Sequence, residues 1–353
     1  MACSQVGAAL QYPTWTSRHR CLGRKILNQD LWEELKGEKT LLTGFTINDV
    51  VRSGVELPTS SVGVYAGDEE CYRLYGPIFD PIIKEYHGID EIPVHLSNLD
   101  PRCLTSMSQL QNKAPILSTR CRVVRNLSGY GISREKRLEV ENVLVTALEG
   151  LEGDLRGHYY PYDSLTTSEK DKLVMGGYLF KEIDKYQAAA GISRDWPEGR
   201  GIFYNKEKTF LVWVNEEDHV RIISMQKGAD VKEVFDRLCR GINAISQALL
   251  RHAQTEFAFH KHYGYLSSCP TNLGTGMRAS VHVSVPRSFN DVQLKNTCRQ
   301  LGLDVRGRHG ETSEAEGGVY DVSNRQRLGR TEVDLLQTVI NGINSLYNTS
   351  TKN

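Results

Sequence analysis

Net charge is the first thing that this chain lacks. Lys plus Arg number 43 and Asp plus Glu also number 43 among its 353 residues. A balanced chain has no global field for nucleic acid or for an anionic membrane, and we expect neither as a partner. Any site for an anion must then be local, built from a few arginines that folding brings together.

Long apolar runs and paired cysteines are missing as well. No run approaches the length of a membrane span, and no secretory leader is recognised. The first 29 residues, which are basic and free of acids, bear only a weak likeness to a mitochondrial presequence. The eight cysteines are scattered, without a CxxC pair: Cys3, Cys21, Cys71, Cys103, Cys121, Cys239, Cys269 and Cys298. This pattern is typical of reduced thiols, so we expect a cytosolic (cytoplasmic) protein.

Several common catalytic motifs are absent too. The sequence contains no GxxxxGK(S/T), no GxGxxG after a predicted strand, no GxSxG and no HExxH. A bound phosphate must therefore be held by side chains and not by a glycine-rich loop.

What is present is a compact and unusual loop at residues 268–278. Its sequence, Ser-Cys-Pro-Thr-Asn-Leu-Gly-Thr-Gly-Met-Arg, places a thiol, hydroxyls and an amide between Gly and Pro, and it leads into an alternating strand at 279–285. Glycines let the backbone approach a ligand, and Arg278 stands where it can clamp an anion. We call residues 268–278 the signature loop, because they resemble the signature of the ATP:guanidino phosphotransferases, the phosphagen kinase family.

Arginines occur on segments that are predicted as strands. Arg120 and Arg122 alternate, so on a strand both guanidinium groups leave from one face. Two like charges side by side are unfavourable unless an anion lies between them. The resemblance implies that both bind nucleotide phosphate, together with three further arginines: Arg221, Arg278 and Arg306.

The adenine site departs from the family pattern. Most family members place a histidine at the position of Gly177. We expect His282, on the strand after the signature loop, or Tyr178 to contact the nucleotide instead, and we do not expect activity to be lost.

Acidic residues gather at the tip of a predicted hairpin. Strands at 209–214 and 220–225 are joined by Asn-Glu-Glu-Asp-His. Such acids are ordinarily solvated, but beside an arginine cluster they favour a cationic group or hydrated magnesium. The resemblance implies that Glu217 contacts the substrate guanidinium. Glu216 and Asp218 would reach Mg²⁺ through water, with no direct protein ligand to the metal.

Two loops match the family segments that select the guanidino substrate. Residues 57–65 form a connector by composition, and the resemblance implies that they hold the substrate carboxylate through Ser61, Val62, Gly63, Val64 and Tyr65. Residues 306–318 have the composition of a mobile surface loop. The resemblance implies a lid that places Arg306 on phosphate and Glu311 on the guanidinium. Both loops resemble the arginine kinase form, because creatine kinases carry a longer first loop and an apolar residue in place of Glu311.

Cys269 and Thr271 complete the expected substrate site. A free guanidinium has a pKa above about 12 and is a poor nucleophile at neutral pH. Glu217 and Glu311 can orient it and accept its proton. A thiolate at Cys269, favoured by nearby arginines and hydroxyl donors, can stabilise the guanidinium charge; a buried and inert thiol is the alternative.

The resemblance also implies the architecture, an α+β fold. Residues 1–90 would form a small all-α N-terminal domain, 91–102 a linker, and 103–353 a larger α/β catalytic domain with an antiparallel β-sheet flanked by helices. Amphipathic patterns at 133–153, 230–252 and 332–347 predict helices of that domain. By analogy with dimeric members, we expect a homodimer with Trp196 and the Tyr12-Pro13 segment at its interface.

The leading hypothesis is therefore an arginine kinase, which with Mg²⁺ reversibly converts ATP and L-arginine to ADP and phosphoarginine. Taurocyamine, lombricine, glycocyamine or creatine is the alternative acceptor. A catalytically weak nucleotide-binding regulatory protein stays open because of Gly177. A hydrolase with Cys269 as nucleophile is disfavoured, because no His/Asp arrangement accompanies it in the sequence.

Overall fold

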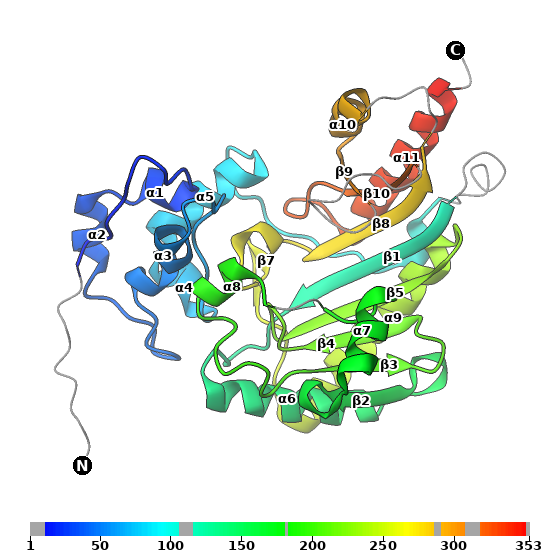
Figure 1. The fold of residues 1–353 in the computed structure, drawn as a ribbon, viewed down its shortest axis with the longest axis horizontal. Coiled ribbons are helices and arrows are strands. Elements are labelled where there is room, and N and C mark those ends of the chain that lie inside the picture. Colours follow the sequence, from blue (N-terminus) through cyan, green and yellow to red (C-terminus); the bar gives the residue numbers. More distant parts are fainter. Residues whose placement is uncertain (1–10, 106–115, 181–182, 286–290, 308–317, 351–353) are drawn as a thin grey trace.

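The structure is a computed structural model that describes residues 11–105, 116–180, 183–285, 291–307 and 318–350 (Figure 1). Its helices are α1 (Leu22–Ile26), α2 (Gln29–Leu35), α3 (Ile47–Glu56), α4 (Glu70–Leu74), α5 (Gly76–His87), α6 (Arg134–Glu149), α7 (Thr167–Met175), α8 (Lys185–Ala189), α9 (Val231–Ala253), α10 (Asp291–Gln300) and α11 (Glu332–Ser350). Its strands are β1 (Ile116–Arg125), β2 (Gly157–Pro161), β3 (Gly201–Asn205), β4 (Phe210–Val214), β5 (Val220–Lys227), β6 (Phe259–His260), β7 (Gly264–Tyr265), β8 (Met277–Ser284), β9 (Leu303–Gly307) and β10 (Val319–Asn324).

Eight of these strands form one antiparallel sheet in the order β2-β3-β4-β5-β1-β8-β10-β9. Helices α1–α5 form a separate, purely helical unit at one end of it (Figure 1). The predicted α+β class is thereby confirmed. Within the described ranges, no helix is long and apolar enough to cross a bilayer.

Local capping chemistry sets where the predicted helices begin. The Ser133 side chain accepts a hydrogen bond from Lys136 N at the start of α6, and Asp230 accepts one from Glu233 N at the start of α9. The helices predicted from residues 133 and 230 therefore begin at Arg134 and Val231, one residue after each capping side chain.

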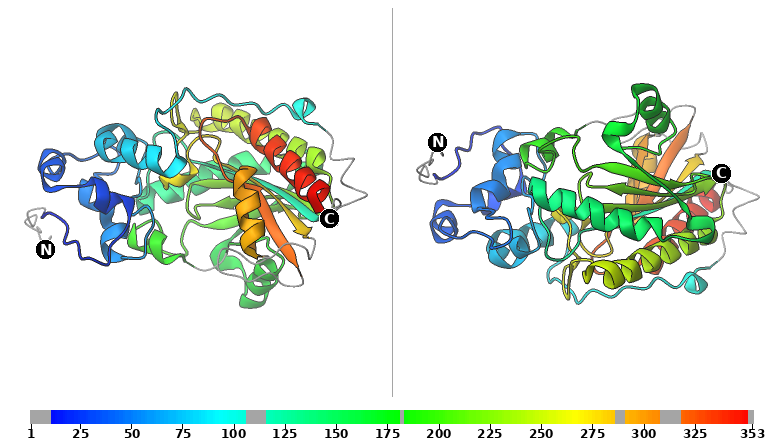
Figure 2. Two further views of the ribbon diagram at one scale, coloured as in Figure 1. Left: turned by 90° about the horizontal axis from the view of Figure 1, so that it is seen from above. Right: turned by 90° about the horizontal axis from the view of Figure 1, so that it is seen from below.

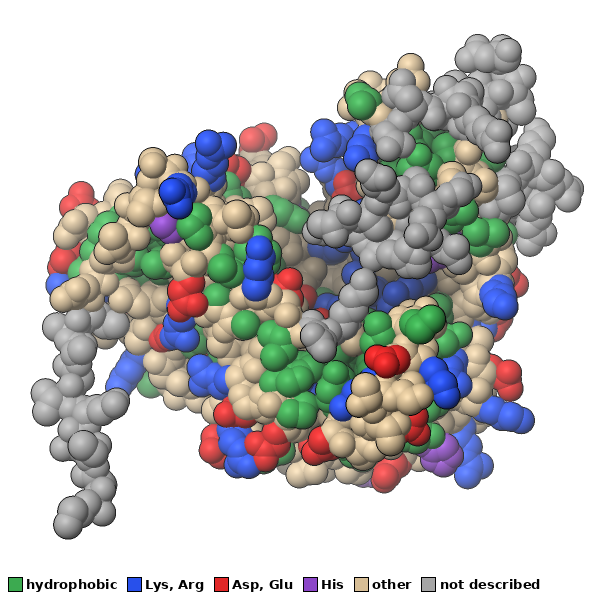
Figure 3. Space-filling view, viewed as in Figure 1, with side chains coloured by type: hydrophobic (Ala, Val, Ile, Leu, Met, Phe, Trp, Pro, Cys, Tyr) green, Lys and Arg blue, Asp and Glu red, His purple; other side chains and the backbone are tan. Residues whose placement is uncertain are grey.

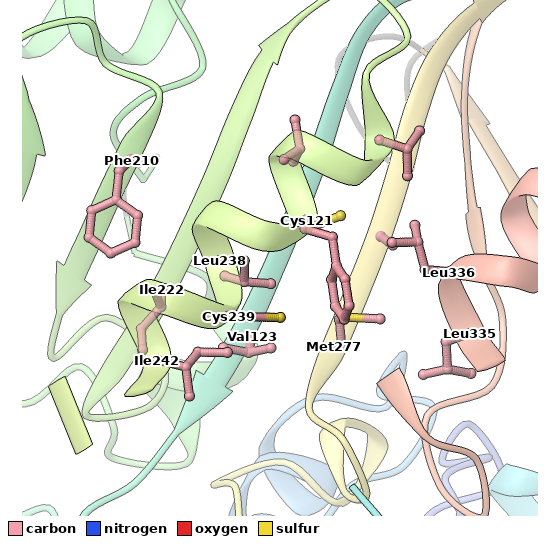
Figure 4. Close-up of a cluster of buried hydrophobic side chains, with 14 of the residues drawn as sticks. Cys121, Val123, Phe210, Ile222, Leu238, Cys239, Ile242, Met277, Leu335 and Leu336 are labelled. Carbon is pink, nitrogen blue, oxygen red and sulfur yellow. The ribbon is translucent and has the colours of Figure 1, made fainter. Parts of the chain in front are cut away.

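One face of the sheet carries the main core. Figure 4 shows Leu238, Cys239 and Ile242 of α9 packed over Cys121 and Val123 of β1. Helices α6 and α11 contribute to the same cluster, and the two views in Figure 2 show these helices lying along the sheet. Because side chains alternate along a strand, a β1 with Cys121 and Val123 in the core directs Arg120 and Arg122 to the opposite face.

The described residues cover only part of the opposite face. Leu211, Trp213 and Ile223 pack there against Leu173 of α7 and Phe180. This second cluster covers the β3–β5 side of the sheet. The middle of the sheet, at β1 and β8, is left for the arginine-bearing surface.

The helical unit has its own core, which extends into the larger part of the chain. Its cluster of buried side chains includes Leu266, Leu273 and Leu328. The helical unit therefore packs directly against the signature loop and its neighbours.

The residues predicted at a dimer interface are engaged within one chain. Tyr12 lies edge-on to Trp32, with 6.0 Å between ring centroids, and its hydroxyl donates to Leu27 O. Trp196 packs against Tyr162 and Phe180. The homodimer stays a prediction.

Candidate active site

Four of the five predicted phosphate-binding arginines lie on adjacent strands in the middle of the sheet. Arg122 of β1 is the cross-strand partner of Arg278 of β8, and Arg221 of β5 lies opposite Val124. Arg306 is on β9, opposite Asp321 of β10. In Figure 3, Lys and Arg side chains gather in the hollow between the helical unit and the sheet.

The arginines perturb one another. Burial, followed by the charges of Arg221 and Arg278, lowers the pKa of Arg120 to about 10. Burial and the charges of Arg221, Arg120 and Arg278 also lower the pKa of Arg122. Among the described residues, Nε and Nη2 of Arg120 have no hydrogen-bond acceptor. Crowded cations with unused donors are the arrangement that a polyanion would relieve.

Three carboxyl groups contact these arginines. Arg221 contacts Glu216 and Glu217 at 3.1 Å each, and Arg278 Nη2 donates to Asp321 Oδ2 at 2.8 Å. Burial would lower the pKa of Arg221, but the neighbouring acids outweigh it and raise that pKa.

Trp213 provides a rigid surface beneath two of the arginines. The guanidinium carbons of Arg120 and Arg221 lie 5.6 Å and 5.3 Å from the centroid of its ring, within the range of a cation–π contact. The indole Nε1 donates to Tyr178 O at 2.7 Å, which fixes the ring.

The acidic hairpin tip is held against the signature loop. Asp218 Oδ1 accepts from Ser268 N at 2.6 Å and from Asn126 Nδ2 at 2.9 Å, and Asn272 Nδ2 lies 3.4 Å from Glu217 Oε2. Burial, then the nearby Asp218, raises the pKa of Glu217 to about 8. Glu217 and the signature loop therefore meet, as the sequence predicted.

Cys269 lies in this junction and is 7% exposed. Its Sγ is 3.2 Å from the hydroxyl of Thr271. Burial and then the charge of Glu217 raise the pKa of the thiol to about 12. Burial and Glu217 thus act against the thiolate expected from the sequence, and they outweigh the hydrogen bonds of Thr271, which lower the pKa of the thiol.

The helical unit holds two carbonyl groups of the signature loop and that of the residue just before it. Ala66 N donates to Ser268 O at 2.8 Å, the Tyr72 hydroxyl to Ser267 O at 2.7 Å, and His87 Nε2 to Pro270 O at 3.0 Å. These contacts lie on both sides of Cys269, so the helical unit fixes the position of the thiol.

The loop at 57–65 reaches the same place. Tyr65 packs against Cys269 and Ile192. Leu22 N and Gly23 N donate to the carbonyls of Ser61 and Val62, at 3.0 Å and 2.9 Å. The four backbone N–H groups of residues 61–64 have no acceptor among the described residues, and Gly63 has a φ of +73°. Unused amides in a turn of this kind form a concave site for an anion.

Two residues of the site carried no recognisable sequence signal. Arg327 donates to Thr271 O at 2.6 Å, and burial together with the charges of Arg278 and Arg306 contributes to a lowered pKa. Tyr86 of α5 is near the same place, since Arg327, Cys269 and Thr271 all act on its phenol. Neither belongs to a periodic pattern, so only the fold places them.

The remaining predicted residues are placed as follows. His282 of β8 lies with Nδ1 3.0 Å from the hydroxyl of Ser118 and with Nε2 4.0 Å from Asp321, on the strand that carries Arg278. Gly177 has a φ of +72°, and no atom lies within 4 Å of where a Cβ would be. Glu311, and the lid predicted around it, lie outside the described residues apart from the ends of that segment.

Comparison with known proteins gave concordant results. The family model for the C-terminal catalytic domain of ATP:guanido phosphotransferases matches residues 139–353, and the model for the N-terminal domain matches residues 17–84. The chain is 45% identical over 335 residues to an arginine kinase of Anthopleura japonica; the match covers 93% of this chain and 46% of that protein, so the chain spans about half of its length. It is 42% identical to an arginine kinase of Penaeus japonicus, over 92% of this chain and 91% of that protein. A crystal structure of lombricine kinase superposes with a TM-score of 0.91 at 37% identity, covering 97% of this chain and 94% of that one.

Proposed function

Because this chain belongs to the ATP:guanido phosphotransferase family, we propose that it is an arginine kinase. It would transfer the γ-phosphoryl group of ATP to a guanidino nitrogen of L-arginine, reversibly, giving ADP and phosphoarginine. The observation that carries this proposal is the arrangement of charge. The crowded arginines adjoin Glu217 through Arg221, and the loop at 57–65 reaches Cys269 through Tyr65. Among the described residues, two donors of Arg120 and the four amides of residues 61–64 have no acceptor.

Both ends of L-arginine suit this site. Its guanidinium suits Glu217, and its carboxylate suits the amides of residues 61–64. Creatine and glycocyamine also carry a guanidinium and a carboxylate, so these two groups alone do not separate the candidates. The relatives named arginine kinase support this choice, whereas the similarity to lombricine kinase keeps other guanidines as the second candidate.

In the proposed reaction a guanidino nitrogen attacks the γ-phosphorus as the bond to the ADP oxygen breaks, and the nitrogen loses a proton. Arg120, Arg122, Arg221, Arg278 and Arg306 would hold and neutralise the phosphates. Glu217 would align the guanidinium and accept the proton, with Glu311 as the proposed second carboxylate. Cys269 would contact the guanidinium without forming a covalent bond.

Mg²⁺ is proposed as the cofactor, bound mainly by the nucleotide. The described residues contain no group of three His, Cys, Asp or Glu side chains that could hold a metal, which suits an ion that keeps its waters and takes phosphate ligands. Glu216 lies on Arg221 at the edge of the cluster and could reach such a water. Asp218 accepts two hydrogen bonds at Oδ1, and its Oδ2, which has no partner among the described residues, could reach such a water as well. When bound, Mg²⁺ would neutralise charge on the phosphates.

The remaining features of the proposal are structural and cellular. We propose the division into a helical domain (1–90), a linker (91–102) and a catalytic domain (103–353), a homodimer, and a cytoplasmic location. Sedimentation of the purified chain would test the dimer.

The deciding experiment is a coupled ATP-consumption assay with Mg²⁺ and a panel of guanidines. L-arginine should give the highest kcat/KM, ahead of creatine, glycocyamine, taurocyamine and lombricine. A preference for another guanidine would overturn the substrate and keep the reaction. No turnover with any of them would favour the nucleotide-binding regulatory protein.

A further inference from the structure

Arg125 is a buried arginine that does not belong to the phosphate cluster. It is the last residue of β1 and is 0% exposed. By strand alternation it lies on the face of Cys121 and Val123, opposite to Arg120 and Arg122. A charge on the core side needs its own explanation, because burying a cation is costly unless it is paired.

The contacts of Arg125 lead to the signature loop. Its Nη1 donates to Val124 O at 2.7 Å and to Thr275 O at 2.8 Å. The guanidinium stacks on Tyr265, with Cζ 3.4 Å from the ring centroid. A flat cation held by an aromatic face can donate in a fixed direction, which a flexible ammonium cannot do.

The same side chain is paired with an equally buried acid. Arg125 Nη2 lies 3.9 Å from Glu332 Oε1, and both side chains are 0% exposed. Glu332 is the first residue of α11. Its carboxylate accepts from Asn98 N at 2.9 Å and from the Ser97 hydroxyl at 3.0 Å and 3.1 Å. A continuous chain of contacts therefore runs from residues 97–98 through Glu332 and Arg125 to Thr275.

Thr275 is a critical point of the signature loop. Its N–H donates to Arg327 O at 3.1 Å, and its hydroxyl accepts from Met277 N at 3.1 Å. At the next position, Gly276, a Cβ would lie 2.8 Å from Val124 O and 3.0 Å from Arg125 Nη1. The backbone is thus pressed against Arg125 immediately before β8, whose Arg278 faces Arg122.

We propose that Arg125 and Glu332 are positioning residues for phosphoryl transfer. The pair fixes the position of Thr275 relative to β1. Arg278 is thereby held opposite Arg122, and Cys269 is held near Glu217. Through Asn98 it also ties the segment between the helical unit and the sheet to the signature loop. This inference rests on the proposed function only for its kinetic readout.

Two substitutions test the pair and one serves as a matched control. Glu332→Gln keeps the shape and one acceptor but removes the charge opposite Arg125. Arg125→Lys keeps the charge but cannot both stack on Tyr265 and donate in a fixed direction. Asp100→Asn, in the same segment, breaks an exposed ion pair with Arg102 at 2.8 Å that has no contact with the loop.

Both test variants should lower kcat about tenfold or more and change the KM for either substrate less, because sub-ångström misplacement acts mainly in the transition state. The second readout is the rate at which iodoacetamide alkylates Cys269 in the folded protein, followed by mass spectrometry of that peptide. Alkylation should become several-fold faster in both variants. Asp100→Asn should match the unmodified protein in both measurements.

Unchanged kcat and unchanged alkylation of Cys269 in a folded Glu332→Gln or Arg125→Lys protein would overturn the proposal. A loss of kcat without faster alkylation would also overturn it. If both variants fail to fold, Ser97→Ala removes only one donor to Glu332 and should raise the alkylation rate in the same direction; no change would count against the proposal. Alkylation does not depend on which guanidine is used, so a wrong substrate and a wrong positioning role give different results.

Discussion

Glu217 provides the sharpest test of the proposed chemistry, because its proton should leave when the substrate arrives. Burial and Asp218 raise its pKa from 4.5 to about 8. At pH 7, before substrate is added, this carboxyl group then carries about nine-tenths of a proton. A cation placed against a carboxylate lowers its pKa by about 1–3 units, and a bound guanidinium is such a cation.

The size of the effect follows from these values. A fall of one unit, to about 7, would release about 0.4 of a proton at pH 7, and a fall of three units, to about 5, would release about 0.9. Cys269 starts at about 12 and would contribute about 0.01 of a proton or less after the same fall. The released proton therefore reports on Glu217.

Isothermal titration of the active guanidine in two buffers of different ionisation enthalpy measures this number directly. The unmodified protein should release between about 0.4 and 0.9 of a proton at pH 7, and Glu217→Gln should release close to none. The exposed Glu207→Gln and the site variant Cys269→Ser are matched controls that should keep the release. Equal release with and without Glu217, or none in the unmodified protein, would refute the reasoning.

Three further predictions follow from the same electrostatics. Glu217→Gln should stabilise the protein by about a few kcal/mol at pH 8.5 and hardly at all at pH 4.5. A raised carboxyl pKa favours the folded state below the unfolded value of 4.5, and that contribution is lost as pH rises through about 8. The same difference in free energy of unfolding between variant and unmodified protein at both pH values, measured with urea, would contradict this. Asp321→Asn removes the 2.8 Å partner of the buried Arg278 and should destabilise the empty protein by about 3–5 kcal/mol. Mg·ADP should restore much of the lost stability, seen as a larger rise in the unfolding temperature for the variant than for the unmodified protein. An equal rise in both proteins would count against a phosphate at Arg278. Alkylation of Cys269 should still be rising with pH at pH 10, because the thiol has a pKa of about 12; a plateau near pH 8 would show a thiolate in the empty site.

The sequence was most informative where local chemistry decides the structure. The amphipathic patterns beginning at 133 and 230 located the starts of α6 and α9 to within one residue, and the predicted hairpin at 209–225 is formed by β4 and β5. The alternation of Arg120 and Arg122 correctly placed both on one face, because a two-residue period does not depend on which strands become neighbours.

Properties that depend on distant segments could not be predicted in the same way. The protonated state of Cys269 results from burial under residues of the helical unit, about 200 positions earlier, and from Glu217. Arg327 reaches Thr271 from a turn after β10 that has no pattern of its own. Strand order is similarly non-local: β1 pairs with β5 and β8, and each pairing needs the full fold.

The arginine cluster itself shows why the sheet matters for function. Burial and the charges of Arg221 and Arg278 lower the pKa of both Arg120 and Arg122, and Arg120 further lowers that of Arg122. Two donor nitrogens of Arg120 have no acceptor among the described residues. Such a cluster would separate on a flexible scaffold, because like charges repel and water solvates them better apart. Here the neighbouring residues Cys121 and Val123 are fully buried beneath α9, so any movement of the arginines would disturb the core. A phosphate group entering the cluster then relieves repulsion without having to gather the cations first, and that preorganisation is what an electrostatically driven phosphoryl transfer requires.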